Sequence, residues 1–259
     1  MDERDLRKGL SGLPLGEVRS YARTSSTNDV ALAWATEGAP DLSLVYAEEQ
    51  TAGRGRGSRR WFTLPETALA CSLVLRPSPV DGRHIPRFSG LGALAVVDGL
   101  GGMGLQPEIK WPNDILVRGK KVCGILVDAV WTGGSVESLV LGIGLNVRPE
   151  SVPPQARLTY PATCLDTELG RGVDRLDLLR RLLEAFLSWR PRLARWEFLQ
   201  AWEGALAFRG SEVEVSAEGG LPRHGLLEGL EEDGSLRLRA SDGSHFTLQF
   251  GEVHLRPLV

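Results

Sequence analysis

The sequence predicts a mixed α/β domain followed by a small all-β domain. Between Thr24 and Val147, strand-like and helix-like patterns alternate, and the later strand candidates are separated by gaps that suit antiparallel hairpins better than parallel crossovers. After Gly210, short alternating apolar runs are separated by Gly-Gly and Asp-Gly turns, which is typical of a small barrel of roughly fifty residues. The change of character at 208–210 therefore predicts two domains, 1–208 and 209–259.

The elements of the first domain follow from periodicity and turn residues. Short apolar runs predict strands at 43–47, 67–75, 108–111, 114–117, 122–127 and 137–141, with turns at Gly119-Lys120 and Gly133-Gly134. The Ala- and Leu-rich run 88–100 predicts a buried helix. Leucines at helical spacing predict an amphipathic helix over 174–189, capped by Asp174, with a second helix from Leu193 to Trp202. The first twenty residues are polar and too few to form a helix-turn-helix module before the first motif.

Composition excludes several classes of protein. The net charge of −3, from 30 basic and 33 acidic residues, argues against a protein that wraps nucleic acid. Three cysteines without paired spacing and four histidines without helical pairing predict neither a disulfide framework nor a metal centre held by the protein. The charged N-terminus is no signal peptide, and no apolar run approaches the roughly 18 residues of a membrane helix. We therefore expect a cytoplasmic protein without a membrane segment.

An arginine- and glycine-rich loop is the most informative segment. Gln50–Trp61 reads QTAGRGRGSRRW, with four arginines within seven residues. Arginine offers bidentate donors to carboxylates and phosphates, and glycine lets the backbone approach a ligand. With no apolar side chain between Gly53 and Arg60, the loop is expected to become ordered over an anionic ligand. By itself the segment also fits an exposed basic loop or an RNA contact.

Two further segments could face a ligand through their backbones. Ser26–Asn28 precede an apolar periodic run and so mark a helix N-terminus, where free N–H groups are available, although most such clusters are only caps. Gly142–Val147 form a glycine-rich strand end, which permits close approach of a flat ligand and is equally compatible with plain turns.

Two lysines belong to strand-like apolar segments. Lys110 closes one such run and Lys121 begins another. Because burial of an unpaired ammonium is costly, each should have an anionic partner. That partner is either a ligand or a nearby carboxylate, for which Asp114 and Asp128 are the candidates.

In this order and at these spacings, the segments resemble the biotin protein ligases. The matching residues are Ser26-Thr27-Asn28, Gly53-Arg54-Gly55-Arg56 with Arg59 and Trp61, Lys110-Trp111-Pro112-Asn113-Asp114, Lys121 with Gly124-Ile125-Leu126, and Gly142, Gly144 and Asn146. The resemblance covers about 24–148 and resumes weakly at 251–256. Asp128 stands where the family commonly has Glu. The resemblance implies a mixed-sheet α/β catalytic domain of the biotin/lipoate ligase type with a small C-terminal SH3-like β-barrel.

The resemblance also implies a reaction and a set of site residues. Biotin would be activated by ATP, with Mg²⁺, to biotinyl-5′-AMP and then transferred to a lysine of a biotin carboxyl carrier protein, a subunit of acetyl-CoA carboxylase. Lys121 and Arg56 would be catalytic. The implied biotin-binding residues are Ser26, Thr27, Asn28, Gln50, Gly53, Arg54, Gly55, Arg56, Lys121 and Gly124. The implied ATP- or adenylate-binding residues are Arg56, Arg59, Trp61, Lys110, Asn113, Asn146 and Arg256.

Several alternatives stay open at this point. A lipoate or octanoate ligase of the same fold would modify a similar carrier lysine, but an aliphatic acid has no ureido ring for polar groups such as Ser26 and Gln50. A non-enzymatic RNA-binding protein using the arginine-glycine loop would bind with steep salt dependence. Some family members carry an N-terminal DNA-binding domain. Ser26 lies too near the start for one here, so no specific DNA binding is expected. A homodimer is compatible with the sequence.

Overall fold

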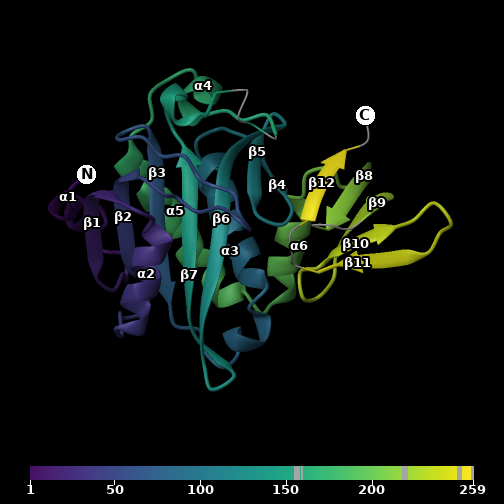
Figure 1. Ribbon diagram of the computed structural model, residues 1–259, viewed down its shortest axis with the longest axis horizontal. Coiled ribbons are helices and arrows are strands. Elements are labelled where there is room, and N and C mark those ends of the chain that lie inside the picture. Colours follow the sequence, from purple (N-terminus) through teal and green to yellow (C-terminus); the bar gives the residue numbers. More distant parts are fainter. Residues whose placement is uncertain (155–157, 159, 218–220, 250–252, 258–259) are drawn as a thin grey trace.

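The computed structural model describes residues 1–154, 158, 160–217, 221–249 and 253–257. They form a seven-stranded mixed sheet with helices on both faces and a separate five-stranded antiparallel sheet (Figure 1). The fold class predicted from the sequence, a mixed α/β domain followed by a small β-domain, is confirmed. None of the helices in these residues is long and apolar enough to cross a membrane.

The seven-stranded sheet has the order β1-β2-β3-β7-β6-β5-β4. Its strands are β1 (Val18–Thr24), β2 (Ser43–Gln50), β3 (Ala68–Leu75), β4 (Pro107–Lys110), β5 (Asp114–Val117), β6 (Lys120–Thr132) and β7 (Ser135–Asn146). From β2 to β4 all neighbours are antiparallel, as the short predicted connections required. Only β1 and β2 pair in parallel, and α2 connects them.

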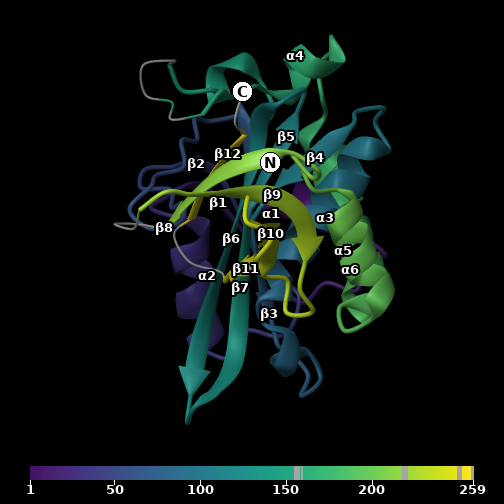
Figure 2. The same cartoon turned by 90° about the vertical axis from the view of Figure 1, so that its right-hand side faces the viewer.

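Helices cover both faces of this sheet. The helices are α1 (Glu3–Gly9), α2 (Thr27–Thr36), α3 (Arg87–Gly101), α4 (Leu165–Leu169), α5 (Arg175–Trp189) and α6 (Trp196–Gly204). In Figure 1, α2 lies in front of the sheet and α3 and α5 lie behind it, and Figure 2 shows the same layers from the side. As predicted, Asp174 caps α5, accepting hydrogen bonds from the backbone N–H groups of Leu176 and Asp177.

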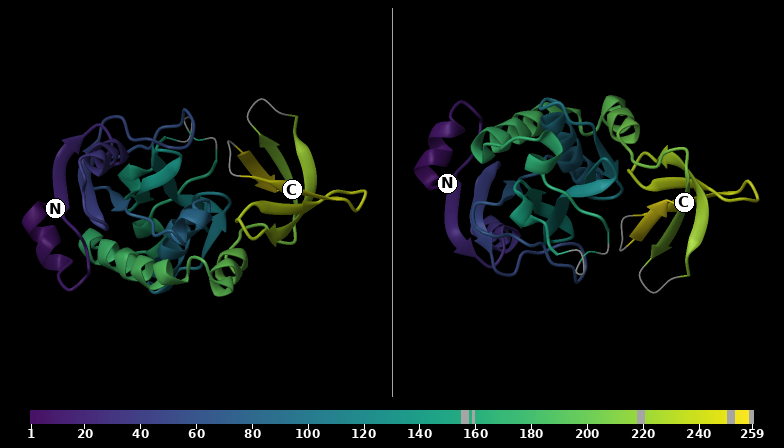
Figure 3. Two further views of the ribbon diagram at one scale, coloured as in Figure 1. Left: turned by 90° about the horizontal axis from the view of Figure 1, so that it is seen from below. Right: turned by 90° about the horizontal axis from the view of Figure 1, so that it is seen from above.

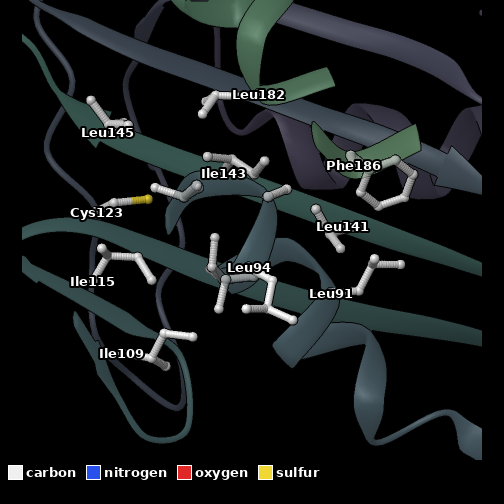
Figure 4. Packing of buried hydrophobic residues seen from close by; sticks show 14 of the residues in the cluster. Leu91, Leu94, Ile109, Ile115, Cys123, Leu141, Ile143, Leu145, Leu182 and Phe186 are labelled. Carbon is white, nitrogen blue, oxygen red and sulfur yellow. The ribbon is translucent and has the colours of Figure 1, made fainter. Parts of the chain in front are cut away.

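The alternation of side chains along each strand sorts the sheet into two faces. One face packs against α3 and α5 and forms the main core (Figure 4). The core residues labelled there include Leu141, Ile143 and Leu145 of β7, Leu91 and Leu94 of α3, and Leu182 and Phe186 of α5. The other face packs against α2 through a smaller cluster that contains Trp34, Val45, Val74 and Val140. Between Leu141 and Leu145, the residues of β7 on that second face are Gly142 and Gly144.

The structure differs from the sequence-based prediction at three places. The first twenty residues contain α1, capped by Asp2 and anchored by the buried Leu6, and the start of β1. Strand β6 extends beyond the predicted 122–127 to Thr132, because its outer half pairs with the start of β7 by backbone hydrogen bonds without a continuous apolar pattern. Strand β7 joins the predicted strand 137–141 to the predicted glycine-rich strand end without a break. The second predicted helix begins only at Trp196, whose side chain is exposed.

The second sheet has the order β11-β10-β9-β8-β12. Its strands are β8 (Glu212–Ala217), β9 (Arg223–Leu230), β10 (Leu236–Arg239), β11 (His245–Leu248) and β12 (Val253–Pro257). Figure 3 shows it at one end of the molecule, beside α6. The β9–β10 turn reaches the first sheet, where Trp111 Nε1 donates to the carbonyl of Gly234 at 3.0 Å and Arg87 Nε donates to that of Glu232 at 2.9 Å.

Candidate functional site

A cavity of about 820 Å³ opens on the α2 face of the seven-stranded sheet. The floor of the cavity is the sheet itself, where Gly124 of β6 and Gly142 and Gly144 of β7 lie on this face without side chains. Gly124 lies directly opposite Gly144 in the strand register. Three glycines in adjacent strands remove the side chains that would otherwise fill the space. The volume is that of a small-molecule site.

Every predicted site residue whose side chain is described lines this cavity. They are Ser26, Thr27, Asn28, Gln50, Gly53, Arg54, Gly55, Arg56, Arg59, Trp61, Lys110, Asn113, Lys121, Gly124 and Asn146. The remaining one, Arg256, belongs to β12, and its side chain lies outside the described residues. Its neighbour Leu255 lines the cavity, so the C-terminal sheet contributes to the wall. Residues far apart in the sequence thus meet in one place, although their individual roles stay predictions.

The N-terminus of α2 forms one wall, and Gln50 caps it. The Oε1 atom of Gln50 accepts from the backbone N–H of Thr27 at 2.8 Å and from its hydroxyl at 3.1 Å. The Nε2 atom of Gln50 donates to Thr63 Oγ1 at 3.2 Å. Ser26 occupies the N-cap position without a side-chain capping bond, and its buried side chain lines the cavity. Of the two possibilities that the sequence left open for this segment, a plain cap or a group facing a ligand, the Ser26 side chain therefore fits the second by position.

Asn28 is turned toward the sheet and is fully engaged there. Its Nδ2 donates to Asp128 Oδ2 at 2.9 Å, and its Oδ1 accepts from Ser72 Oγ at 2.6 Å. A Cβ atom on Gly142 would lie 2.0 Å from Asn28 Oδ1. The close approach at Gly142 is therefore made by this asparagine, where the sequence allowed either a plain turn or a flat ligand.

The arginine-glycine loop is a compact hairpin. The backbone N–H of Gly55 donates to the carbonyl of Arg59 at 2.8 Å, and that of Trp61 donates to the carbonyl of Gly53 at 2.8 Å. A Cβ atom on Gly53 would lie 2.5 Å from the Trp61 carbonyl oxygen, so the close crossing needs glycine. Backbone hydrogen bonds therefore order the loop, although it lacks the apolar packing on which the sequence-based expectation depended.

The arginines of the loop point to different partners. Arg54 Nη1 contacts Asp29 Oδ1 at 2.9 Å and Asp128 Oδ2 at 3.1 Å. Burial acts to lower the pKa of the Arg54 guanidinium, but the charges of Asp128 and Asp29 outweigh it and raise that pKa. Arg56 Nη1 instead donates to Asn113 Oδ1 at 3.4 Å, and Arg59 Nε donates to the carbonyl of Arg56. Arg54 is thus held by carboxylates of the protein itself.

Trp61 covers the glycine floor. A Cβ atom on Gly144 would lie 2.5 Å from Trp61 Cε2, and one on Gly124 would lie 3.2 Å from Cζ3. The flat group stacked on Gly144 is thus the indole of the protein. Its Nε1 is buried and has no hydrogen-bond partner among the described residues. This donor lies against Gly144, 2.7 Å from the position of a Cβ atom there.

Lys121 has the carboxylate partner that the sequence offered as one alternative. Its Nζ lies 2.6 Å from Asp114 Oδ1, with 26% and 11% of the two side chains exposed, and 5.6 Å from the centroid of the Trp61 ring. The backbone of Lys121 is fixed between Pro161 and Thr163 by bonds of 2.8 and 2.9 Å. The ammonium is therefore held in one place at the cavity wall, with part of its surface still accessible.

Lys110 and Asn146 complete the wall near Lys121. The Lys110 Nζ lies 4.3 Å from the centroid of the Tyr160 ring, a cation–π contact. Burial, reinforced by the charges of Asp114 and Glu108, raises the pKa of the Tyr160 phenol. Asn146 Nδ2 donates to the carbonyl of Thr163 at 3.0 Å. Both predicted residues thus contact the segment that follows β7.

Sequence reasoning missed several residues of this site. Thr63, Leu158, Tyr160, Ala162 and Leu255 also line the cavity. Leu255 belongs to the segment 251–256, where the resemblance is weak. No short motif marks the other four, which reach the site only through tertiary packing. Asp114 was predicted as part of the motif 110–114 and as a possible lysine partner, but not as a site residue. Its position beside Asn113 was a usable signal, because Asp114 orients Lys121 and Asn113 orients Arg56.

The chain is similar to known proteins over most of its length. Residues 20–146 match the model of the Biotin/lipoate A/B protein ligase family. The biotin–[acetyl-CoA-carboxylase] ligase of Paracoccus denitrificans is 36% identical over 230 residues, which cover 86% of this chain and 94% of the relative. The ligase of the same name from Mycobacterium tuberculosis is 34% identical over 269 residues, covering 99% and 96%. The structure of the biotin protein ligase from Aquifex aeolicus in complex with biotin and ATP superimposes with a TM-score of 0.77 at 26% identity, covering 93% and 99%.

Proposed function

The chain belongs to the biotin/lipoate A/B protein ligase family, and from this membership we propose that it is an ATP-dependent biotin protein ligase. The relatives described above are biotin ligases, and the Aquifex aeolicus structure holds biotin and ATP. These similarities favour biotin and ATP as substrates over the lipoate or octanoate alternative. They also argue against a non-enzymatic RNA-binding protein.

The observation that supports the proposal most directly is a pair of fixed cations at the cavity wall. Asp114 orients the Lys121 ammonium at 2.6 Å, and the neighbouring Asn113 accepts from the Arg56 guanidinium at 3.4 Å. A carboxylate and a triphosphate repel each other, and their reaction concentrates negative charge where they meet. Cations that are held in place beforehand stabilise that charge without reorganising.

The proposed reaction has two steps. A carboxylate oxygen of biotin attacks the α-phosphorus of ATP, the bond to the bridging oxygen of the β-phosphate breaks, and pyrophosphate leaves. The neutral ε-amine of a carrier lysine then attacks the acyl carbon of biotinyl-5′-AMP. AMP leaves with the electron pair of the acyl C–O bond, and the surplus proton of the amine passes to solvent. We propose that Lys121 contacts the carboxylate and the α-phosphate, and that Arg56 contacts the adenylate.

The other predicted residues take supporting roles in this proposal. Ser26, Thr27 and Gln50 would meet the ureido ring, whose two donors and one acceptor match hydroxyl and amide groups. The remaining biotin contacts are proposed for Asn28, Gly53, Arg54, Gly55 and Gly124. The nucleotide side is proposed to include Arg59, Trp61, Lys110, Asn113, Asn146 and Arg256.

Mg²⁺ is proposed to enter with ATP as part of the substrate. Among the described residues, no group of three or more His, Cys, Asp or Glu side chains is placed to hold a metal ion. The triphosphate oxygens are therefore its proposed ligands, and the ion would neutralise part of their charge.

The partner and context of the reaction are proposed as follows. The acceptor is a biotin carboxyl carrier protein of acetyl-CoA carboxylase, as the names of the relatives specify for them. The protein acts in the cytoplasm, divides into domains at 1–208 and 209–259, and binds no DNA sequence specifically. A gel shift with and without biotin and ATP tests the DNA proposal, and sedimentation analysis tests for the homodimer that the sequence leaves open.

The decisive experiment measures ATP–pyrophosphate exchange with biotin, with lipoate, with octanoate and without an added acid. The proposal requires exchange that depends on biotin, followed by transfer of biotin to a purified carrier domain. Exchange that occurs equally well with lipoate or octanoate would reassign the substrate. Absence of exchange under every condition would refute the activity.

A further inference from the structure

The arginine-glycine loop is tied to the sheet by an ionic contact at its first arginine. Arg54 Nη1 and Nη2 contact the two oxygens of Asp128 at 3.1 and 3.2 Å, which makes the contact bidentate. Asp29, in the first turn of α2, adds a third contact at 2.9 Å. Arg54 therefore connects the loop both to β6 and to α2.

Asp128 is itself held in position from the buried side of the cavity. Its Oδ2 accepts from Asn28 Nδ2, and Asn28 Oδ1 accepts from the hydroxyl of Ser72, which is fully buried on β3. Side chains on α2, β3 and β6 thus form one continuous hydrogen-bonded chain that ends at Arg54. A carboxylate fixed in this way offers the guanidinium one position, which lowers the entropy cost of pairing.

Asp128 has no role in the proposed reaction, and the sequence predicted it only as a possible partner of a lysine. We infer that Asp128 is a positioning residue: through Arg54 it holds the arginine-glycine loop over the cavity and so retains the adenylate. In this arrangement the Arg54 guanidinium anchors the loop inside the protein, and Arg56 and Arg59, farther along the loop, are the arginines proposed to contact the nucleotide. The inference rests on the proposed biotin ligase function and assigns a role within that site.

The expected consequence is leakage of the intermediate. Biotinyl-5′-AMP is an activated mixed anhydride that reacts with any amine it meets after release. Asp128→Asn keeps the size of the side chain and an oxygen that can accept from Asn28, but it removes the charge that binds Arg54. Since the pair is partly exposed, its loss should raise labelling of a bystander protein, per adenylate formed, by about 3- to 10-fold. Arg54→Gln removes the contact with Asp29 as well, so it should raise labelling at least as much.

The matched controls separate positioning from general damage. Asp128→Glu keeps the charge, so this variant should hold the adenylate nearly as well as wild type does. Asp177→Asn breaks an exposed ion pair on α5, Asp177 to Arg181 at 2.8 Å, far from the loop in the sequence and outside the cavity lining, and should change nothing. The double variant Arg54→Gln/Asp128→Asn should leak no more than Arg54→Gln alone, because Arg54→Gln already removes the contact with Asp128 as well as the one with Asp29.

The experiment has two measurements. Albumin is incubated with each variant, biotin and ATP, and its biotin labelling is read on a streptavidin blot. Hydrogen exchange of residues 53–60 is measured in the ligand-free protein. Asp128→Asn and Arg54→Gln should both raise bystander labelling and speed exchange in the loop. Additive effects in the double variant, or unchanged loop exchange in Asp128→Asn, would overturn the inference. A wild-type protein without biotin-dependent pyrophosphate exchange would refute the proposed function instead, and loop exchange would still test the tether.

Discussion

Replacing Lys121 separates the chemical role of its ammonium from its structural role. The Nζ–Oδ1 distance to Asp114 is 2.6 Å, and the two side chains are 26% and 11% exposed. This burial lies between that of surface pairs, which contribute about 0–1 kcal/mol, and that of buried pairs, where loss of one partner costs about 3–5 kcal/mol. Lys121→Met should therefore destabilise the fold by about 2 kcal/mol, which lowers Tm by roughly 4–8 °C for a domain of this size.

The same substitution should reduce adenylate formation by about 10²- to 10³-fold, the usual effect of removing one fixed donor to developing charge. The double variant Lys121→Met/Asp114→Asn distinguishes the two effects. With no unpaired carboxylate left behind, its stability should largely return, whereas its exchange rate should stay low. Thermal denaturation and ATP–pyrophosphate exchange on the same samples provide the test. Recovery of exchange together with stability, or unchanged exchange in the single variant, would remove Lys121 from the catalytic residues.

Three further predictions follow from individual contacts. Gly144→Ala should reduce adenylate formation about 10-fold or more with little loss of stability. The new methyl group would lie 2.5 Å from the Trp61 indole, which must shift on its loop. Pyrophosphate-exchange kinetics and Tm measure the two effects. Arg56→Gly should still form biotinyl-5′-AMP but release it about 10- to 100-fold faster, seen as biotin labelling of albumin; unchanged labelling alongside continued synthesis would shift attention to another arginine of the loop. Burial alone would raise the pKa of Glu48, but hydrogen bonding, chiefly from Arg175, outweighs it and lowers that pKa from 4.5 to about 2. Because the folded-state pKa is depressed, the stabilisation of about 3 kcal/mol is present above pH 4.5 and lost as the pH falls toward 2. The free energies of unfolding of wild type and Glu48→Gln, measured by urea denaturation, should therefore converge over that range.

Local signals predicted most of the elements and the segments that line the cavity. The cap at Asp174, the apolar period of 174–189 and the turn at Gly133-Gly134 each depend on a few neighbouring residues, and the structure has all three. The order of motifs from Ser26 to Asn146 likewise predicted residues that line one cavity, because each motif ends or begins an element at the same face of the sheet.

Strand registers and side-chain partners across the fold were decided only by tertiary structure. Sequence alone allowed Lys121 to pair with either Asp114 or Asp128; the register of β5 against β6 selected Asp114. The contact of Arg54 with Asp128 spans 74 positions, and no pattern in either segment predicts it. Such contacts depend on which strands neighbour each other and on which face each residue points to, so a shift by one residue would exchange every partner. Propensities act over a few residues, whereas the packing of α2 against four strands, β2, β3, β6 and β7, determines where these charges meet.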